Sequence, residues 1–304
     1  MKKNNTTITL LQGRLGNQLF EYAFARARAF ESGSKCVLSE APLTARGIQN
    51  RLDCFVLSPD VEFVDHHTLS WRQYIGMSLY AHLVQPHSRI KRYELEEKLC
   101  WLWEFCGLFL CENGYIIPPS GRHISNKDFI CVGYMQSEKF FYNQRKQILS
   151  ELSFKQNIYE SVKDMAEKIK SSNEPTCLHV RLGDYVKNPL HGVLDAAYYR
   201  RALDEMRRYR PNATIFVFSD NVELVREELN LQSDVYYISP DIDEQQTMYL
   251  GSLCKNFIIS NSSFSWWMQY LSRWADKLVL APSRWYASEC PCDIYLKDWV
   301  LLNV

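Results

Sequence analysis

The sequence predicts an α/β fold with two domains, the second of which is a doubly wound parallel sheet. Short apolar runs rich in β-branched residues alternate with helical stretches. The length of 304 residues favours two domains at about 150 residues each. Because the predicted strands are apolar on both faces, helices must cover both sides of the sheet. This alternation is typical of a Rossmann-type domain.

The first half opens with a strand, a glycine loop and a helix. Strands are expected at Thr6–Leu11, Lys35–Leu38 and Asp128–Gly133. Helices are expected at Asn17–Ser32, Ser137–Leu149 and Asn157–Lys170, with Gly33 ending the first. Residues 66–125 are rich in Trp, Tyr, Leu and Cys and show only weak helical periodicity.

The second half is more regular. Strands are expected at Thr176–Val180, Thr214–Phe218, Val235–Ile238, Phe257–Ile259 and Lys277–Leu280. Helices are expected between and after them, at Ala196–Tyr209, Val222–Leu229, Glu244–Leu253 and Phe264–Ala275. We therefore expect a first domain over residues 1–155 and a second over residues 156–304.

Composition argues against several classes of protein. The 35 Lys and Arg residues balance 35 Asp and Glu residues, so the basic excess that duplex nucleic acid requires is absent. Met1–Thr7 has no apolar core of the about 7–15 residues that a signal peptide needs. The most apolar window, Leu99–Cys111, falls short of the about 20 residues of a spanning helix. We expect a cytoplasmic protein whose ten cysteines are small buried thiols.

Polar segments follow the predicted strands, where ligands of open α/β sheets bind. They are Gly13–Gln18, His179–Asp184, Ser219–Asn221, Ser239–Asp243 and Ser260–Trp267. The first is a glycine loop between a strand and a helix, a junction at which backbone N–H groups favour an anion. A purely structural tight turn is the alternative for this loop.

Two of these segments favour a diphosphate ligand. His179 and Arg181 are two residues apart on a strand and therefore point to one face. The guanidinium of Arg181 matches two phosphate oxygens, although an ion pair with Asp184 is the alternative. Ser262–Phe264 opens a helix and offers hydroxyls and amides either to an anion or to the helix itself as a cap. An arginine and a helix N-terminus, without a Walker lysine, point to a sugar nucleotide rather than ATP.

Four segments carry a resemblance to a known family: Gly13–Ala23, Gly133–Phe141, His179–Asp184 and Ser260–Trp267. In sequence and in order over residues 8–281, they are similar to the signature segments of glycosyltransferase family 11, the GDP-fucose-dependent α-1,2-fucosyltransferases. The resemblance implies a GT-B-like fold, with two Rossmann-type domains facing each other across a cleft. It also implies transfer of L-fucose from GDP-fucose, a donor substrate rather than a cofactor, to the 2-hydroxyl of a terminal galactose.

The resemblance implies roles for individual residues. Arg181 would grip the β-phosphate of GDP, and Asp220 would meet the guanine or the ribose. Arg14 and Asn17 resemble residues of protein O-fucosyltransferases that lie close to the donor sugar. The expected nucleotide-binding set is His179, Arg181, Asp220, Asn261, Ser262, Ser263 and Phe264, and the expected catalytic set is Arg181, Arg14, Asn17, Glu138 and Asp184.

A β-linked donor and an α-linked product imply inversion by a single displacement through an oxocarbenium-like transition state. Arg181 and Arg14 would stabilise the leaving diphosphate. The sequence does not identify the general base, for which Glu138, Asp184 and His179 are all candidates.

We expect no metal ion. Asp241 and Asp243 match the D-x-D pair of metal-dependent glycosyltransferases, but Asp243 precedes Gln246 by three residues, as in a capping box. Trp266 and Trp267 are adjacent on a helix and point in different directions, so at least one is expected in the core.

Two other functions stay open: another GDP-fucose transferase, such as a protein O-fucosyltransferase, or a nucleotide-sugar-binding scaffold without turnover. The expected partners are GDP-fucose and a galactose-terminated oligosaccharide or lipid-linked glycan.

The apolar segment Trp71–Val84 precedes the basic residues Arg89, Lys91 and Arg92. It is expected either to lie on an anionic membrane surface, which would place the protein at the inner face of a bacterial membrane, or to supply ordinary core. The core alternative concerns Trp71, Tyr74, Leu79 and Leu83.

Overall fold

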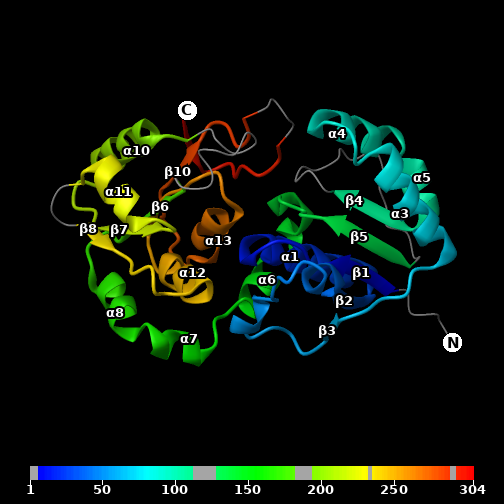
Figure 1. Ribbon diagram of the computed structural model, residues 1–304. Coiled ribbons are helices and arrows are strands. Elements are labelled where there is room, and N and C mark those ends of the chain that lie inside the picture. Colours follow the sequence, from blue (N-terminus) through cyan, green and yellow to red (C-terminus); the bar gives the residue numbers. More distant parts are fainter. Residues whose placement is uncertain (1–5, 112–127, 182–193, 232–234, 288–291) are drawn as a thin grey trace. The chain divides into compact units, whose positions relative to one another are not determined.

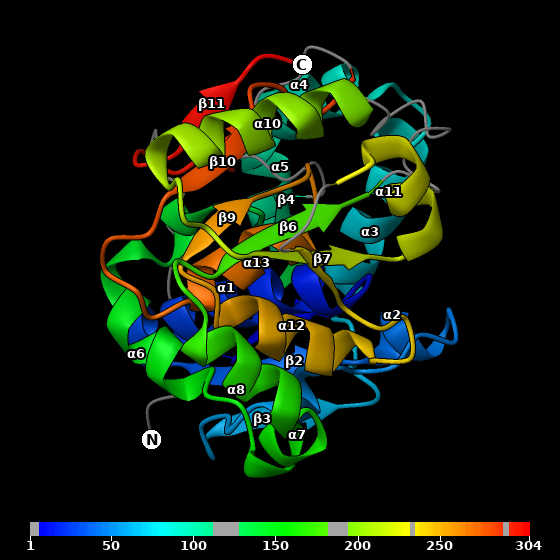
Figure 2. The same cartoon turned by 90° about the vertical axis from the view of Figure 1, so that its left-hand side faces the viewer.

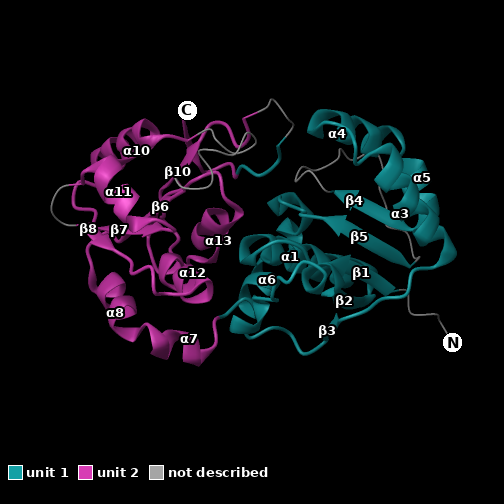
Figure 3. Cartoon of the chain, in the orientation of Figure 1, with its two compact units in different colours: residues 1–153, 290–295 teal, residues 154–289, 296–304 magenta. Residues whose placement is uncertain are grey.

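The computed structural model describes residues 6–111, 128–181, 194–231, 235–287 and 292–304 (Figure 1). The chain divides into two compact units, residues 1–153 with 290–295 and residues 154–289 with 296–304 (Figure 3). Each unit contains a parallel sheet with helices against it. The prediction of two α/β units with parallel sheets is therefore confirmed. Residues 290–295 join unit 1, whereas the sequence predicts a second domain that runs unbroken from residue 156.

The sheet of unit 1 has the strand order β3-β2-β1-β5-β4, and its neighbouring strands are parallel. The strands are β1 (Thr6–Leu10), β2 (Lys35–Ser39), β3 (Val61–Val64), β4 (Leu108–Cys111) and β5 (Phe129–Gly133). Thr7 of the central strand β1 aligns with Cys36 on one side and with Phe129 on the other. The order of connection therefore reverses between β1 and β5.

The helices of unit 1 begin with α1 (Leu15–Ser32), which ends at Gly33 in the left-handed conformation, as expected. The others are α2 (Ala41–Thr44), α3 (Trp71–Leu83), α4 (Arg89–Lys98), α5 (Cys100–Cys106) and α6 (Arg145–Glu151). Short 3₁₀ turns lie at η1 (Leu52–Cys54), η2 (Glu138–Phe140) and η3 (Tyr142–Gln144). Figure 1 shows α3, α4 and α5 gathered beside β4 and β5.

The predicted helix Ser137–Leu149 is wrong, because the segment is two 3₁₀ turns followed by a short helix. The backbone of Phe141 leaves the helical region at φ −140°. Its ring is fully buried and lies 6.3 Å from the ring of Phe20, centroid to centroid. Tertiary packing of this side chain overrides the local helical preference of the segment.

The sheet of unit 2 has the order β11-β10-β9-β6-β7-β8, also parallel between neighbours. Its strands are β6 (Thr176–Val180), β7 (Ile215–Ser219), β8 (Val235–Tyr237), β9 (Asn256–Ile258), β10 (Val279–Pro282) and β11 (Val300–Leu302). The first five lie at or within two residues of their predicted bounds, whereas the sequence does not predict β11.

The helices of unit 2 cover both faces of its sheet. They are α7 (Gln156–Ser161), α8 (Lys163–Ser171), α10 (Ala196–Tyr209), α11 (Val222–Leu229), α12 (Glu244–Ser252) and α13 (Ser263–Leu271). Figure 2 shows α10 on one side of β9, β6 and β7 and α12 and α13 on the other. The unit is therefore doubly wound, as predicted. The single helix predicted at Asn157–Lys170 is wrong, because buried Val162 leaves the helical region at φ −130°.

The cores follow the prediction from composition. Both Trp266 and Trp267 are fully buried, and the ring of Trp266 stacks on that of Tyr270 at 4.5 Å. Seven of the nine cysteines in the described ranges are buried, as expected, whereas Cys100 and Cys292 are half-buried. Burial raises the pKa of the Cys36 and Cys131 thiols to about 12. Of the helices in the described ranges, none is long and apolar enough to cross a membrane.

Candidate active site

The expected donor-binding residues lie at the point where the connections of the unit 2 sheet reverse direction. From β6 the chain proceeds to β7 and β8 on one side, while β9, β10 and β11 lie on the other. β6 pairs directly with β9, with Leu178 opposite Ile258. The segments after these two strands therefore meet at the same sheet edge, which is the usual ligand position in such folds.

His179 joins β6 to the beginning of α13. Its Nδ1 lies 3.1 Å from the Ser260 hydroxyl and 2.5 Å from the Ser265 hydroxyl, and these two hydroxyls lie 2.8 Å apart. Burial, together with the nearby charge of Arg181, lowers the pKa of His179 to about 3. The imidazole is therefore a weak base at neutral pH, and its Nδ1 is engaged by hydroxyls, which disfavours it as the general base.

Ser260 and Ser265 are functional candidates that the sequence does not single out, although both lie in the Ser260–Trp267 segment. Both are fully buried, and buried hydroxyls need hydrogen-bond partners. The signal in the sequence is the density of serines around a helix start, which does not say which of them face the histidine.

Arg181 lies immediately after β6 and faces the end of β7. Its Nη1 is 3.4 Å from Oδ2 of Asp220, and its side chain is 17% exposed. Its backbone N–H donates to the hydroxyl of buried Tyr199 at 3.1 Å. Among the described residues, Asp220 is thus a charge partner of Arg181. Asp184, the alternative partner expected from the sequence, lies outside the described residues.

The N-terminus of α13 is built by the predicted serines. Ser262 is the N-cap, and its hydroxyl accepts from the Phe264 N–H at 3.3 Å. The Asn261 side chain is buried and donates to the Trp285 carbonyl at 2.9 Å, so it anchors the loop that follows β10. Ser263 is half-buried, and the ring of Phe264 lies 5.6 Å from the His179 imidazole.

In unit 1, two of the motif segments meet where the sheet connections reverse between β1 and β5. The Asn17 side-chain oxygen accepts from Nε2 of Gln136 at 2.8 Å. Asn17 lies in the first turn of α1, and Gln136 follows β5. Arg14 is the N-cap residue of α1, and its side chain is exposed. Gln136 lies in a motif segment, but the sequence alone gives it no role.

The glycine loop has a conformation that few residues other than glycine adopt. Gly13 has φ +67°, and a Cβ there would lie 2.5 Å from Nδ2 of Asn17. Its carbonyl accepts from Nε2 of Gln18 at 3.0 Å. The tight approach between Gly13 and Asn17 explains why this loop needs glycine.

A buried carboxyl supports the same loop. Glu21 is fully buried on α1, and its Oε2 accepts from the Gln12 N–H at 2.8 Å. Burial raises the pKa of Glu21 well above its usual value, although the hydrogen bond from Gln12 opposes this. Glu21 lies in a motif segment, but the sequence gives it no role, because burial of a glutamate is not visible in the chain.

Glu138, a candidate base, lies in η2 of unit 1. Its Oε1 is 3.7 Å from Nε of Arg145, and its side chain is 17% exposed. Neighbouring Ser137 and Lys139 both bind Asp293, whose carbonyl accepts from Ser137 Oγ and whose carboxylate accepts from Lys139 Nζ, each at 2.6 Å. The returning segment 290–295 therefore anchors the motif that carries Glu138.

The D-x-D pair has structural partners. Oδ1 of Asp243 accepts from the Gln246 N–H at 2.8 Å, and Gln246 Oε1 accepts from the Asp243 N–H at 2.9 Å, so the predicted capping box is confirmed. Asp241 lies 3.2 Å from the Ser239 hydroxyl. Within the described ranges, no cluster of three or more His, Cys, Asp or Glu side chains is arranged to hold a metal ion.

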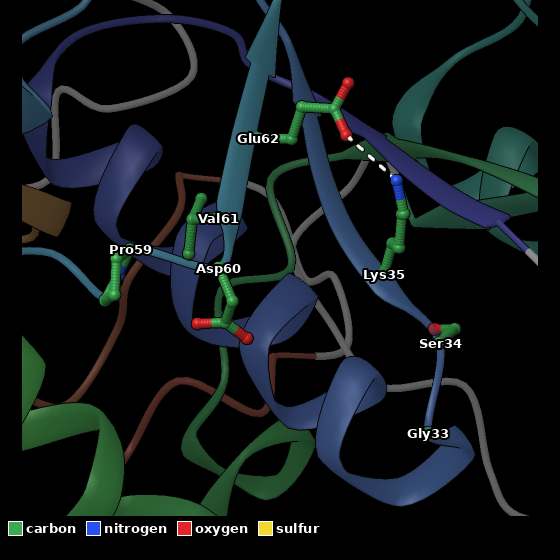
Figure 4. A pocket seen from close by; sticks show the side chains of 7 residues that line it. All are labelled: Gly33, Ser34, Lys35, Pro59, Asp60, Val61 and Glu62. Carbon is green, nitrogen blue, oxygen red and sulfur yellow. Dashed lines mark ion pairs between the residues drawn. The ribbon is translucent and has the colours of Figure 1, made fainter.

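A separate cavity of about 550 Å³ lies in unit 1 (Figure 4). Its lining is Gly33, Ser34, Lys35, Pro59, Asp60, Val61 and Glu62. These residues lie at the amino ends of β2 and β3, with Lys35 3.8 Å from Glu62. The motif segments follow carboxyl ends of strands, so this cavity is not part of the candidate site.

Comparison with known proteins assigns the family. Residues 116–303 match the glycosyl transferase family 11. The chain belongs to this family. It is therefore a glycosyltransferase, as the four motif segments predict.

The relatives of this family 11 member include bacterial and animal proteins. The α-1,2-colitosyltransferase of Escherichia coli is 29% identical over 297 residues, 93% of each chain. The galactoside α-(1,2)-fucosyltransferase 1 of Leontopithecus chrysomelas is 27% identical over 96% of this chain and 73% of its own. The O-antigen biosynthesis glycosyltransferase WbnK of Escherichia coli is 31% identical over 178 residues, which span only 59% of that protein and 56% of this chain.

The fold of the family 11 chain is shared with a solved fucosyltransferase. NodZ from Bradyrhizobium superposes with a TM-score of 0.56 over 88% of this chain and 93% of its own, at 14% identity. At this identity the likeness concerns the fold. It agrees with the GT-B class expected from the sequence.

Proposed function

We propose that this family 11 glycosyltransferase transfers L-fucose from GDP-fucose to the 2-hydroxyl of a terminal galactose, with inversion at the anomeric carbon. Membership of the family and the α-1,2-fucosyl- and α-1,2-colitosyltransferases among its relatives support the reaction. The observation that carries the proposal is that Arg181, paired with Asp220, follows β6, while α13, whose Ser265 contacts His179 of β6, follows the adjacent strand β9.

This edge is suited to a nucleotide diphosphate. Arg181 would place two parallel N–H donors on phosphate oxygens, and the N-terminus of α13 would add amides and the Ser262 and Ser263 hydroxyls. Asp220 holds one side of the guanidinium at 3.4 Å, so we assign it the positioning of Arg181 before GDP arrives. Asn261 and His179 would keep the loop and the helix start in place through their buried hydrogen bonds.

The chemistry required of this chain is stabilisation of a leaving diphosphate and removal of one proton. Charge that develops on the diphosphate would be met by Arg181 and by the helix N-terminus. Glu138 and Asp184 are the carboxyl groups proposed to accept the proton of the acceptor hydroxyl. Arg14 and Asn17 are proposed to contact the donor sugar and its phosphates. A metal ion has no part in this proposal, because the guanidinium and the helix N-terminus supply the positive charge.

A GDP-release assay tests the reaction class. We expect GDP to form from GDP-fucose when a free β-galactoside is added, and not with a folded protein domain as acceptor. Turnover on the protein domain alone would favour a protein O-fucosyltransferase, and GDP binding without transfer to any acceptor would favour a scaffold. The corresponding nucleotide-linked colitose should be tested as a second donor in the same assay. The reason is that a relative whose alignment covers 93% of this chain is a colitosyltransferase.

A further inference from the structure

Seven of the thirteen exposed large apolar side chains in the described ranges lie on three neighbouring helices of unit 1. They are Trp71, Tyr74, Ile75 and Leu83 on α3, Ile90 on α4, and Trp101 and Phe105 on α5. The helices α3 and α5 pack against each other and against β4 (Figure 1). We call these seven side chains the α3–α5 apolar surface.

The outward face of α3 begins with exposed apolar side chains, where a surface helix is normally polar. Exposed Ser78 and His82 follow on the same face. Trp71, Tyr74 and Ile75 follow the i, i+3, i+4 spacing of one helix face, and Trp71 and Tyr74 are 67% and 68% exposed. The opposite face already supplies the core contacts of this helix, through buried Gly76 and Tyr80. The exposed side chains are therefore not needed to hold α3 in the fold.

The alternative that Trp71, Tyr74, Leu79 and Leu83 are ordinary core is wrong for three of these four residues. Trp71, Tyr74 and Leu83 are exposed, whereas Leu79 packs against the cluster around β4 and β5. An exposed apolar area that spans several elements marks an interaction surface.

Cations lie within and beside this surface. The Arg72 guanidinium lies over the rings of Phe105 and Trp71, at 4.8 Å and 5.4 Å from their centroids. Three more cations, Arg89, Lys91 and Arg92, open α4, and neither α3 nor α4 has an acidic residue in its first turn. Because a helix N-terminus favours anions and not cations, the helix dipole does not stabilise these charges. Within α4, Lys91 pairs with Glu94 at 2.8 Å. An external anionic surface would add to the stabilisation of these cations.

We propose that the α3–α5 apolar surface docks the enzyme on the headgroup region of an anionic membrane. Trp and Tyr rings are suited to the depth of the headgroups, with Ile, Leu and Phe side chains at the acyl boundary. Arg72 and the cations of α4 would meet lipid phosphates. Docking would bring the enzyme to acceptors carried on lipids, but it does not depend on which sugar is transferred.

Flotation with lipid vesicles, without donor or acceptor, tests the proposal. At about 0.1 M salt, the wild-type protein should float with vesicles of equal parts phosphatidylcholine and phosphatidylglycerol. At about 1 M salt, much less protein should float, because charges are screened within about 3 Å. Vesicles of phosphatidylcholine alone should carry much less protein. Absence of flotation with the anionic vesicles would overturn the proposal.

Variants locate the contact. The triple variant Trp71→Ser, Tyr74→Ser and Phe105→Ser should lose about tenfold or more in vesicle binding, and Arg89→Gln with Lys91→Gln and Arg92→Gln should lose the dependence on anionic lipid. The matched control Tyr209→Ser removes an aromatic side chain that is 51% exposed on α10 and should bind as wild type. Equal binding by all variants would contradict the proposal.

Two further measurements distinguish membrane docking from misfolding and from self-association. The triple variant should keep the thermal melting temperature and the transfer to a soluble galactoside, so its loss of vesicle binding cannot be a loss of folding or of activity. If wild type sediments as a dimer and the triple variant as a monomer, while neither binds vesicles, the surface is an interface between copies and the membrane proposal fails. Failure of fucose transfer by wild type would overturn the proposed function and leave vesicle binding unaffected.

Discussion

At the scale of single residues, the proposed donor site of unit 2 centres on the Arg181 guanidinium, which lies beside the Asp220 carboxylate. Arg181 lies 3.4 Å from Asp220. The two residues directly follow β6 and β7, adjacent strands that align over their length. A planar guanidinium can keep this contact on one side and offer parallel donors to a diphosphate on another. A lysine offers a point charge and cannot do both with the same geometry.

The Arg181→Ala variant should fold but lose about 10²–10³ in the rate of transfer, the usual cost of removing a donor that stabilises developing charge. Arg181→Lys should recover only a minor part. GDP release from GDP-fucose with a β-galactoside measures both, with Arg207→Ala, an exposed arginine on α10, as the control that keeps activity. A lysine variant with wild-type turnover would refute the phosphate role.

Gly13 offers a second test at this scale, because the chain contains a matched control. Gly13 and Gly47 have φ of +67° and +65°, but a Cβ at Gly13 meets Asn17 at 2.5 Å whereas at Gly47 it meets no atom within 4 Å. Gly13→Ala and Gly47→Ala should each lose about 1–2 kcal/mol of stability from backbone strain. Only Gly13→Ala should also lose transfer activity, through displaced Asn17. Equal activity of both variants would remove the glycine loop from the site.

At the scale of elements, a buried ion pair joins α1 to α6 and supports the helix that carries Asn17. The Arg26 guanidinium makes two 2.7 Å hydrogen bonds to the Glu151 carboxylate, which also accepts from the Tyr22 hydroxyl at 2.8 Å. Both charged side chains are almost fully buried. Removing Glu151 would take away both of these hydrogen bonds and leave the buried Arg26 charge with a more exposed partner, Asp60, at 3.0 Å.

Glu151→Ala should therefore destabilise the protein by about 3–5 kcal/mol, measured by urea unfolding. Glu31→Ala removes an exposed carboxylate that pairs with Arg28 and should cost less than about 1 kcal/mol. A Glu151→Ala variant as stable as Glu31→Ala would show that the pair contributes little.

The same pair gives stability a dependence on acid. Burial alone would raise the pKa of Glu151, but hydrogen bonds from Arg26, Gln147 and Tyr22 lower it below its usual value. A carboxyl with a lowered folded-state pKa contributes stability above its unfolded pKa, and that contribution is lost as the pH falls through the folded pKa. Unfolding free energy measured from pH 7 downward should fall less steeply in Glu151→Ala than in wild type. Identical slopes would contradict this assignment.

The elements also show what the sequence can and cannot predict. The bounds of β6, α10 and α11 agree with the prediction, because their apolar pattern and their caps are local signals. The segments Ser137–Leu149 and Asn157–Lys170 break at Phe141 and Val162, where burial of a side chain against the rest of the unit decides the backbone. Such tertiary effects leave no trace in local periodicity.

In the candidate site, too, the sequence predicts what depends on local signals but not what depends on tertiary contacts. Arg181, Ser262 and Asn17 could be found from position, because each follows a predicted strand. The contacts of His179 with Ser260 and Ser265, and of Arg181 with Tyr199, depend on strand order, which the sequence alone does not give. The general base could not be chosen from the sequence either, since its position depends on the bound acceptor.

At the scale of the whole molecule, each unit brings two motif segments together at the point where its sheet connections reverse. In unit 1 these are the segments after β1 and β5, joined by Asn17 and Gln136, and in unit 2 those after β6 and β9, joined by His179 and Ser260. The four segments that resemble family 11 are thus paired by topology.

Metal dependence is a property of the whole enzyme. Because Asp243 is engaged in a capping box and Arg181 with the α13 N-terminus supplies positive charge, fucose transfer should survive EDTA without loss. Activity before and after chelation, and again with added Mn²⁺, measures this. A loss that Mn²⁺ restores would give Asp241 and Asp243 a ligand role.

The linkage of the product is the sharpest test of the proposed reaction. GDP-fucose and a methyl β-galactoside should be incubated with the purified enzyme and the product examined by nuclear magnetic resonance. We predict fucose in α linkage to oxygen 2 of galactose. A β linkage, or attachment to another hydroxyl, would contradict the proposed transfer.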